Sequence, residues 1–273
     1  METTIRLGSF LTIFAVMAIW EIYAPRRPLM QAKHKRWLTN IFIVLADALL
    51  LRLMGGLVAY SAAIYAAQHG WGWLNITAWP FWLEFIIALL LLDFALYLQH
   101  VASHYVSLLW RLHQVHHTDL DIDLTTGVRF HPVEIGLSML YKIALVIAIG
   151  APPWAVLVFE IILNGAALFN HSNVYLPEKM DRWLRKIIVT PDMHRVHHST
   201  LIRETNSNFG FSVSWWDRLC GTYRAEPAAG QLGMEIGLKE YRDFQALGFL
   251  SILLLPFRRL LTAAYPKQDN KRS

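Results

Sequence analysis

The amino-acid sequence predicts an all-α integral membrane protein with about four to five membrane-embedded helices, two of which form a helical hairpin. Of its 273 residues, 55% are hydrophobic and only 16% are charged, whereas about a quarter of the residues in a typical soluble domain are charged. Several apolar runs approach the length of about 20 residues that a helix needs to cross a bilayer. A single membrane-embedded unit explains both observations more simply than soluble domains do.

Two apolar segments are expected to span the membrane near the N-terminus. Residues 7–23, LGSFLTIFAVMAIWEIY, favour a retained span over a cleaved signal peptide. The short segment before them has only one basic residue, Arg6, and no clear small-x-small cleavage site follows. A basic segment, residues 24–39, leads into a long apolar stretch over residues 40–68. The uncharged, tryptophan-rich residues 69–79 are typical of a membrane interface.

A third span is predicted over WLEFIIALLLLDFALYLQH, residues 82–100. The apolar region over residues 135–169 is too long for one crossing and is interrupted by Ala151-Pro152-Pro153-Trp154, so it predicts a helical hairpin. Residues 244–261, FQALGFLSILLLPFRRLL, have about twelve apolar residues before Pro256 and predict an interfacial helix rather than a span. The final PKQDNKRS is expected to be a basic tail.

The orientation follows from the basic loop. Lysine and arginine are retained on the cytoplasmic side, so residues 24–39 are expected there and residues 69–79 on the opposite side. The third span then returns to the cytoplasm, and the hairpin leaves from that side and comes back to it. Residues 100–131 and 171–198, which are rich in histidine, therefore emerge on one cytoplasmic face. We expect a multi-pass membrane protein, located in the inner membrane if the source is bacterial.

Ten of the twelve histidines lie between positions 100 and 198. HVASH, at residues 100–104, places two imidazoles on one helical face, and HQVHH and HRVHH, at residues 113–117 and 194–198, place three each within roughly 100° of arc. RFHP and FNHSN add a single histidine each. The predicted metal ligands are His100, His104, His113, His116, His117, His131, His171, His194, His197 and His198. His34 and His69 are interpreted as ordinary interfacial residues.

So many histidines at helical spacing would repel one another if protonated, so a shared positive ion is the simplest stabiliser. One zinc ion takes about four ligands and a haem takes two. Two ions therefore account for ten clustered histidines better than one zinc ion or one haem does. Imidazole suits iron, zinc and copper alike.

The single cysteine, Cys220, excludes a cysteine-ligated site, and the sequence has no HExxH peptidase motif. The basic residues flank apolar segments, which argues against a nucleic acid as partner.

The order HVASH, HQVHH, RFHP, FNHSN, HRVHH between hydrophobic spans resembles the integral-membrane sterol desaturase and fatty acid hydroxylase superfamily. The resemblance runs from about residue 80 to residue 225 and includes NSNFGFSVSWWDRLCGTY, residues 206–223. It implies a non-haem di-iron centre, which zinc can replace in a purified sample, with dioxygen as co-substrate. It also implies hydroxylation, or desaturation, of a lipid or sterol-like substrate. Since no second domain for a redox carrier remains in the sequence, a separate electron-donor protein is expected.

Under this resemblance, the chain divides into an N-terminal transmembrane region of two spans over residues 1–78, a catalytic domain over residues 79–225, and an interfacial helix with a basic tail over residues 226–273. Metal-bound histidines need an outer hydrogen-bond partner that fixes the tautomer. The candidates by proximity in sequence are Asp93, Asp119, Glu134, Asn170 and Asp192. The segment over residues 215–218, WWDR, predicts an amphipathic element that serves as a structural anchor or contacts the substrate.

Two other functions remain open from the residues alone. A zinc-dependent membrane hydrolase would use the same histidines to activate water. A non-enzymatic membrane protein would use them to hold a metal ion or a bis-histidine haem. The first would act without dioxygen or reductant, and a haem would be visible in the absorption spectrum.

Overall fold

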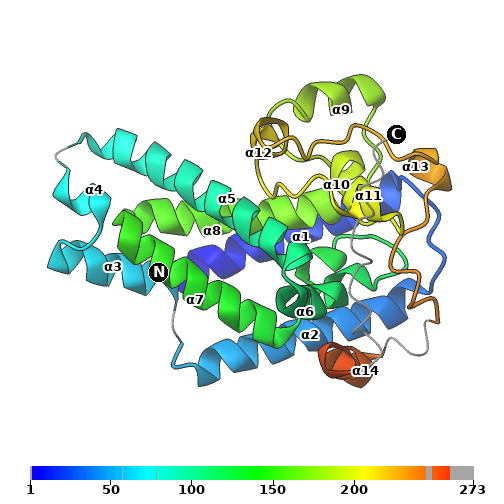
Figure 1. Ribbon diagram of the computed structural model, residues 1–273, viewed down its shortest axis with the longest axis horizontal. Coiled ribbons are helices and arrows are strands. Elements are labelled where there is room, and N and C mark those ends of the chain that lie inside the picture. The colour runs from blue at the N-terminus through cyan, green and yellow to red at the C-terminus, as the bar shows by residue number, and fades with distance from the viewer. Residues whose placement is uncertain (1, 57, 78, 244–247, 259–273) are drawn as a thin grey trace.

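A computed structural model describes residues 2–56, 58–77, 79–243 and 248–258 (Figure 1). These residues form helices and connecting loops and contain no β-strand, which confirms the all-α expectation. The elements in chain order are α1 Glu2–Tyr23, α2 Lys33–Leu53, α3 Ala59–His69, α4 Trp73–Ile76, α5 Phe81–Tyr105, α6 Ser107–His117, η1 Thr126–Val128, α7 Pro132–Ile149, α8 Pro153–His171, α9 Glu178–Leu184, α10 Pro191–His197, α11 Ile202–Thr205, α12 Trp215–Leu219, α13 Gly230–Gly233, α14 Phe249–Leu254 and η3 Leu255–Phe257.

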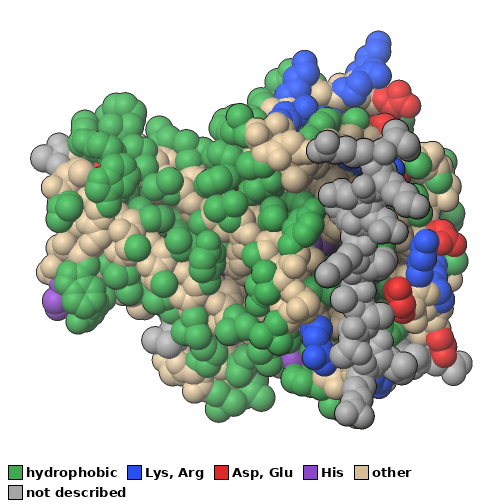
Figure 2. All heavy atoms as spheres, in the orientation of Figure 1, with side chains coloured by type: hydrophobic (Ala, Val, Ile, Leu, Met, Phe, Trp, Pro, Cys, Tyr) green, Lys and Arg blue, Asp and Glu red, His purple; other side chains and the backbone are tan. Residues whose placement is uncertain are grey.

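Four of these helices are long and apolar enough to cross a membrane. They are α1, α5, α7 and α8, with mean hydropathies of 1.7, 2.1, 1.8 and 1.5. Hydrophobic side chains cover the left half of the face in Figure 2, over α3, α5 and α7, whereas lysine, arginine and acidic side chains gather at the opposite end. A helix that exposes apolar side chains over this length is stable in lipid rather than water. The chain is therefore an integral membrane protein.

The structure differs from the single second span expected over residues 40–68. The apolar stretch is divided into α2 and α3 by a turn at Gly55 and Gly56, whose φ angles are +83° and +63°. Such angles are unfavourable for other residues and end a right-handed helix. α2 carries charged residues and is not one of the four apolar helices. α3 packs against α7 and α8, so α2 and α3 together carry the chain from the basic loop to the far end of the bundle.

The predicted helical hairpin is confirmed. α7 ends at Ile149 and is capped by Gly150, which has a φ of +71°. α8 begins at Pro153. The turn between them packs so closely on the loop between α3 and α4 that a Cβ on Gly72 would lie 2.2 Å from the Gly150 nitrogen. Both turns therefore lie at the left end of the molecule in Figure 1, whereas α6 and the histidine-bearing end of α5 lie near its middle.

The N-terminal helices also hold the loop that joins α6 to α7. The buried Arg36 on α2 donates to both oxygens of Asp119 at 2.8 Å and to Asp123 at 2.8 Å. Burial by itself would raise the pKa of Asp119, but the charges of Arg36 and Arg129 outweigh it and lower this pKa to about 2. Glu21 on α1 accepts from the Leu124 nitrogen at 2.7 Å. Residues of the predicted N-terminal region are thus part of the frame that carries the histidines.

The described part of the C-terminal region contains a short helix, α14, where the sequence predicts an interfacial one. α14 and η3 lie against α2 and α6, where Ile252 and Leu255 pack with Ile43 and Val115. The predicted basic tail, PKQDNKRS, lies outside the described residues.

Candidate metal centre

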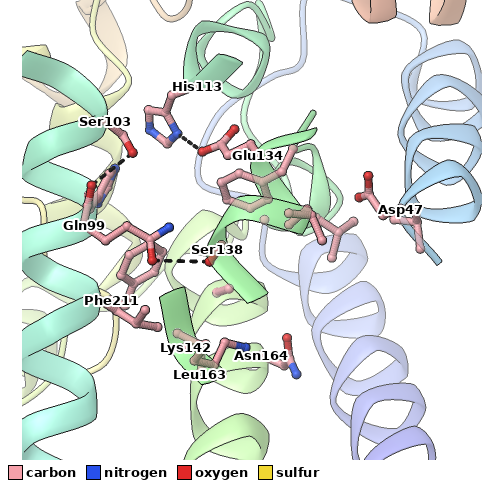
Figure 3. A pocket seen from close by; sticks show the side chains of 18 of the residues that line it. Asp47, Gln99, Ser103, His113, Glu134, Ser138, Lys142, Leu163, Asn164 and Phe211 are labelled. Atoms are coloured by element: carbon pink, nitrogen blue, oxygen red, sulfur yellow. Dashed lines mark hydrogen bonds and ion pairs between the residues drawn. The ribbon is translucent and has the colours of Figure 1, made fainter. Parts of the chain in front are cut away.

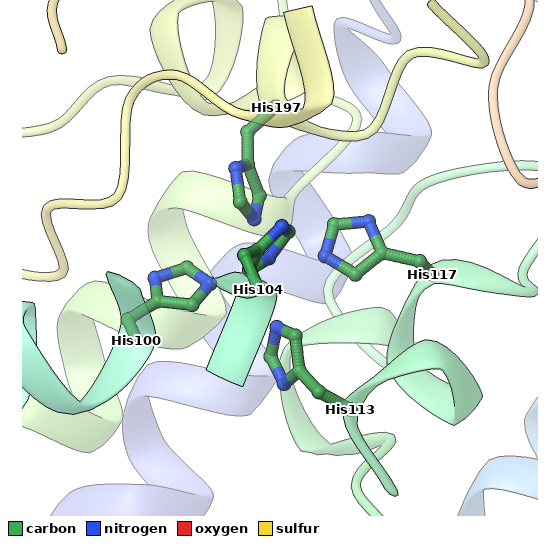
Figure 4. Close-up of side chains that lie close together, drawn as sticks. All are labelled: His100, His104, His113, His117 and His197. Carbon is green, nitrogen blue, oxygen red and sulfur yellow. The ribbon is translucent and has the colours of Figure 1, made fainter. Parts of the chain in front are cut away.

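Nine of the ten predicted ligands form two buried groups, in each of which the potential ligand atoms all lie within 4.8 Å of one another. Figure 4 shows the five rings of the first group converging from α5, α6 and α10. The first group is His100, His104, His113, His117 and His197, and the second is His116, His171, His194 and His198. The two groups are adjacent, because the stacked rings of His117 and His198 have centroids 4.7 Å apart. This arrangement would accommodate two neighbouring metal ions.

Each HxxHH motif contributes to both groups. The i, i+4 pair of the first motif, His113 and His117, joins the first group, and His116 joins the second. The second motif does the reverse, since its i, i+4 pair joins the second group and His197 joins the first. Residues four apart lie one above the other on a helix, and the residue between them is rotated to one side. The repeated motif therefore explains how two short helices contribute imidazoles to both groups at once.

Four histidines of the first group have their ring orientation fixed by an oxygen atom. In each of them Nδ1 donates a hydrogen bond, because carbonyl and carboxylate oxygens only accept. The pairs are His100 with the Phe209 carbonyl at 2.7 Å, His197 with the Ser207 carbonyl at 2.8 Å, His113 with Glu134 Oε1 at 2.6 Å and His104 with Asn206 Oδ1 at 3.2 Å. Their four Nε2 atoms are buried and have no hydrogen-bond partner in the described part of the chain. An Nδ1–H tautomer leaves Nε2 with a free lone pair, which is what a metal ligand requires.

In the second group, the Nε2 atom of His171 lies close to those of two other histidines. His171 donates from Nδ1 to the Ala167 carbonyl at 2.7 Å, and its Nε2 lies 3.1 Å from that of His116 and 3.0 Å from that of His194. Two nitrogens bound at right angles to one ion, at about 2.1 Å each, would be separated by about 3.0 Å. Gly127 allows η1 to pack closely against α8 beside His171, because a Cβ on Gly127 would lie 2.5 Å from the Ala167 oxygen.

The imidazoles at the end of α10 are held in the neutral form. Burial, with a further contribution from His113, lowers the pKa of His197 to about 3. Burial and the neighbouring imidazoles also lower the pKa of His198 well below 6.5. A neutral imidazole is the form that binds a metal ion. The donor set therefore fits two metal ions at neutral pH.

The segment over residues 206–211, NSNFGF, supplies three of the outer partners. Asn208 has a φ of +53°, and its side-chain amide donates to the Met193 and Arg224 carbonyls at 2.8 Å each. The buried Asp217 accepts from the nitrogens of Phe209 and Gly210 at 2.7 and 2.9 Å. These contacts hold a turn whose carbonyls face the histidines. The segment was predicted to matter only through the resemblance, and the structure gives it this physical role.

The structure places the five predicted outer partners differently. Only Glu134 contacts a histidine of the two groups, and the other four hold the surrounding frame. Asp93 accepts from Trp216 Nε1 at 2.8 Å, Asn170 donates to the Phe211 carbonyl at 2.9 Å, Asp119 binds Arg36, and Asp192 binds Arg26 and Arg195. The predicted amphipathic element is α12, where the buried Asp217 and the Trp216–Asp93 contact support the anchor interpretation.

His131 lies outside both groups. Its Nδ1 accepts a hydrogen bond from the Val133 nitrogen at 3.2 Å, and its Nε2 lies 3.1 Å from the Leu253 carbonyl. It is the N-cap of α7, and Pro132 occupies the first helical position, as proline does in many helices. Both ring nitrogens are used by the protein, so the RFHP motif places a helix cap where the sequence predicted a metal ligand.

A cavity of about 300 Å³ extends from the first histidine group into the membrane-spanning part of the bundle. Figure 3 shows side chains from α2, α5, α7 and α8 around it, with His113 and Glu134 at one end and Lys142 at the other. Its apolar lining includes Phe10, Val44, Leu96, Phe130, Ile135, Leu163 and Phe211. A mostly apolar cavity with a few polar groups is the usual form of a site for a small hydrophobic molecule.

The fold and the two histidine groups define an integral-membrane histidine-box protein. Residues 85–222 match the family model described as "Fatty acid hydroxylase", and the chain belongs to this family, which confirms the resemblance found in the sequence. It is 32% identical over 185 residues to an ornithine lipid hydroxylase of Rhizobium tropici, covering 66% of this chain and 52% of the relative. It is 26% identical over 218 residues to an alkylglycerol monooxygenase of Xenopus tropicalis, covering 71% and 46%.

More distant relatives include a Delta(7)-sterol 5(6)-desaturase of Eremothecium gossypii, 28% identical over 142 residues, or 52% of this chain and 38% of the relative. The chain spans about half the length, or less, of the curated relatives it matches. No solved structure matches the chain.

Proposed function

We propose that this protein is a membrane-bound, dioxygen-dependent di-iron enzyme that hydroxylates, or desaturates, a lipid or sterol-like substrate. The observation that carries the proposal is the pair of convergent, buried histidine groups beside an apolar cavity within the bundle. The relatives named above are hydroxylases, monooxygenases and desaturases. Their activities favour this proposal over a zinc-dependent hydrolase or a haem protein.

The nine imidazoles would hold two iron ions, five nitrogens surrounding one and four the other. When bound, the iron pair would supply the activation of dioxygen, in which two electrons and two protons from outside allow one oxygen atom to enter a C–H bond while the other leaves as water. Zinc suits the same nitrogen ligands and can replace iron during purification.

The chain itself would bind the substrate, orient it and exclude water. His100 and His113 form part of the cavity wall, so a hydrocarbon chain in the cavity lies directly against the first histidine group. Phe211 packs on His100 with ring centroids 4.9 Å apart, and it lines the same cavity. These apolar walls keep bulk water from the site, which protects a reactive oxidant from side reactions.

We further propose that the metal centre faces the cytoplasm and receives electrons from a separate donor protein. The basic loop over residues 24–39 supports this orientation through the positive-inside rule. It joins the histidine-bearing end of the bundle, because Arg27 donates to the carbonyls of Gln231 and Met234 there.

The experiment is to purify the full chain, measure its metal content, and incubate it with dioxygen, a reductant and a total lipid extract. The expected result is iron in the protein and an oxygenated lipid that appears only when dioxygen and reductant are both present. Iron below one ion per chain together with no dioxygen-dependent product would overturn the proposal. Zinc-dependent product formation without dioxygen would support the hydrolase instead.

A further inference from the structure

Asp47 is a buried carboxylate for which the proposed chemistry has no role. It lies on α2, lines the cavity, and is 9% exposed. Its Oδ1 atom is buried without a hydrogen-bond partner, and no ion pair to Asp47 exists among the described residues. Figure 3 shows Asp47 across the cavity from Ser138 and Glu134.

The other charged side chains of the cavity wall have partners. Glu134 accepts from His113 at 2.6 Å. Lys142 forms an ion pair with Glu160 at 3.3 Å, and Glu160 also pairs with Arg6 at 3.3 Å. Asp47 is thus the charged group of the described cavity wall that the protein leaves unpaired.

An unpaired carboxylate is costly in this position. Burial, with a further contribution from Glu134, raises the pKa of the Asp47 carboxyl to about 8, so its ionised form is unfavourable without a positively charged partner. Ionisable residues within membrane proteins generally face a cavity and serve function. A positively charged group in the cavity would neutralise Asp47, whereas an anionic headgroup would be repelled by both carboxylates.

We propose that Asp47 binds an ammonium group of the substrate, which is therefore an amine-bearing lipid. This inference rests on the proposed function and names its substrate class. The cavity wall on α7 runs from Glu134 to Lys142, eight residues apart, which corresponds to about 12 Å along a helix. The ammonium nitrogen then lies within roughly ten bonds of the oxidised carbon, since an extended chain advances about 1.2 Å per bond.

A first test uses the stability of the protein without added ligand. Asp47→Asn keeps the shape of the side chain and removes the group that can ionise. We expect the melting temperature of this variant, in phosphatidylcholine nanodiscs, to equal or exceed that of the wild type, because ligand-binding residues are often retained at a cost in stability. A melting temperature several degrees lower would show that Asp47 supports the fold, and would overturn the proposal.

The second test measures binding directly and needs no catalysis. Tetradecylamine, tetradecanol and tetradecanoic acid are added separately to the iron-loaded full chain in the same nanodiscs, and the rise in melting temperature is followed. We expect only the amine to stabilise the wild type. Asp47→Asn should raise its half-saturating concentration at least tenfold, as expected for a lost charged hydrogen bond. Glu84→Gln, an acid-to-amide change on α5 outside the cavity, should leave it unchanged.

Equal stabilisation by the three amphiphiles, or amine binding that persists in Asp47→Asn, would overturn the proposal. These outcomes are separate from failure of the proposed function. A protein that binds the amine through Asp47 but forms no dioxygen-dependent product would retain this binding site and refute the oxygenase.

Discussion

The two histidine groups offer nearly the same ligands but are held by the protein in different ways. In the first group, four of the five imidazoles donate from Nδ1 to an oxygen of Phe209, Ser207, Glu134 or Asn206. In the second, among the residues that the structure describes, only His171 has such a partner, and the Nδ1 atoms of His116, His194 and His198 are buried without one. Outer hydrogen bonds orient metal ligands and strengthen them as donors. The comparison indicates that the protein preorganises the first group for the proposed ion, whereas an ion would itself have to organise the second.

The largest expected effect comes from removing one ligand of either group. His197→Ala, in the first group, and His194→Ala, in the second, should each lower dioxygen-dependent product formation at least 100-fold, because the proposed reaction needs both ions. Product is measured by mass spectrometry after confirming that each variant is inserted in the membrane. The exposed His69 serves as the control, and His69→Ala should retain activity within twofold. Full activity in either ligand variant would remove its group from the reaction.

The next effect concerns the outer partners, which distinguish the first group. Glu134→Ala should lower activity or iron affinity by about 10- to 100-fold, the usual effect of losing a hydrogen bond to a metal-bound histidine. Glu134→Gln should be milder, since its amide oxygen still accepts from His113. Asn206→Ala should also reduce iron affinity, through His104. If the alanine variants bind iron like the wild type, the proposed preorganisation of the first site is wrong.

A third prediction compares the two sites within one molecule. Dilution of the iron-loaded protein into a chelator should release iron in two phases that differ about tenfold in rate, with the second group losing its ion first. The faster phase should be absent in His194→Ala. A single phase, or a fast phase that His194→Ala retains, would contradict the difference between the sites.

The smallest effect is expected at His131, the predicted ligand that lies outside both groups. His131→Ala should cost about 0.5–2 kcal/mol of stability, as expected for the loss of a helix N-cap, and should leave the iron content unchanged. Thermal unfolding and metal analysis of one preparation measure both quantities. Loss of an ion in this variant would restore His131 to the ligand set.

The histidine spacing predicted most of the site because helical periodicity has a direct sequence pattern. HQVHH and HRVHH each place three imidazoles on one helical face, and the structure brings all six into the two groups. His131 could not be separated from the ligands by this reasoning, because a histidine before a proline is compatible with a loop ligand and with a helix cap. The hairpin was predictable from Pro152 and Pro153, whereas the break at Gly55 and Gly56 interrupts an apolar stretch that otherwise resembles one span.

The outer partners were largely unpredictable for a different reason. Three of them are the backbone carbonyls of Ala167, Ser207 and Phe209, and a carbonyl group carries no residue type that a sequence could reveal. Proximity in the sequence identified Glu134 but also suggested Asp119 and Asp192, which instead bind arginines. A contact between segments about 100 residues apart, such as His104 with Asn206, depends on the packing of the whole bundle.

The central claim is that the two groups hold one iron ion each, and the iron content of the purified protein tests it most directly. Wild-type protein loaded with iron should contain two ions per chain, and His194→Ala and His197→Ala should each contain about one. A wild-type content of one ion or less, or two ions retained in both variants, would contradict this account of the site.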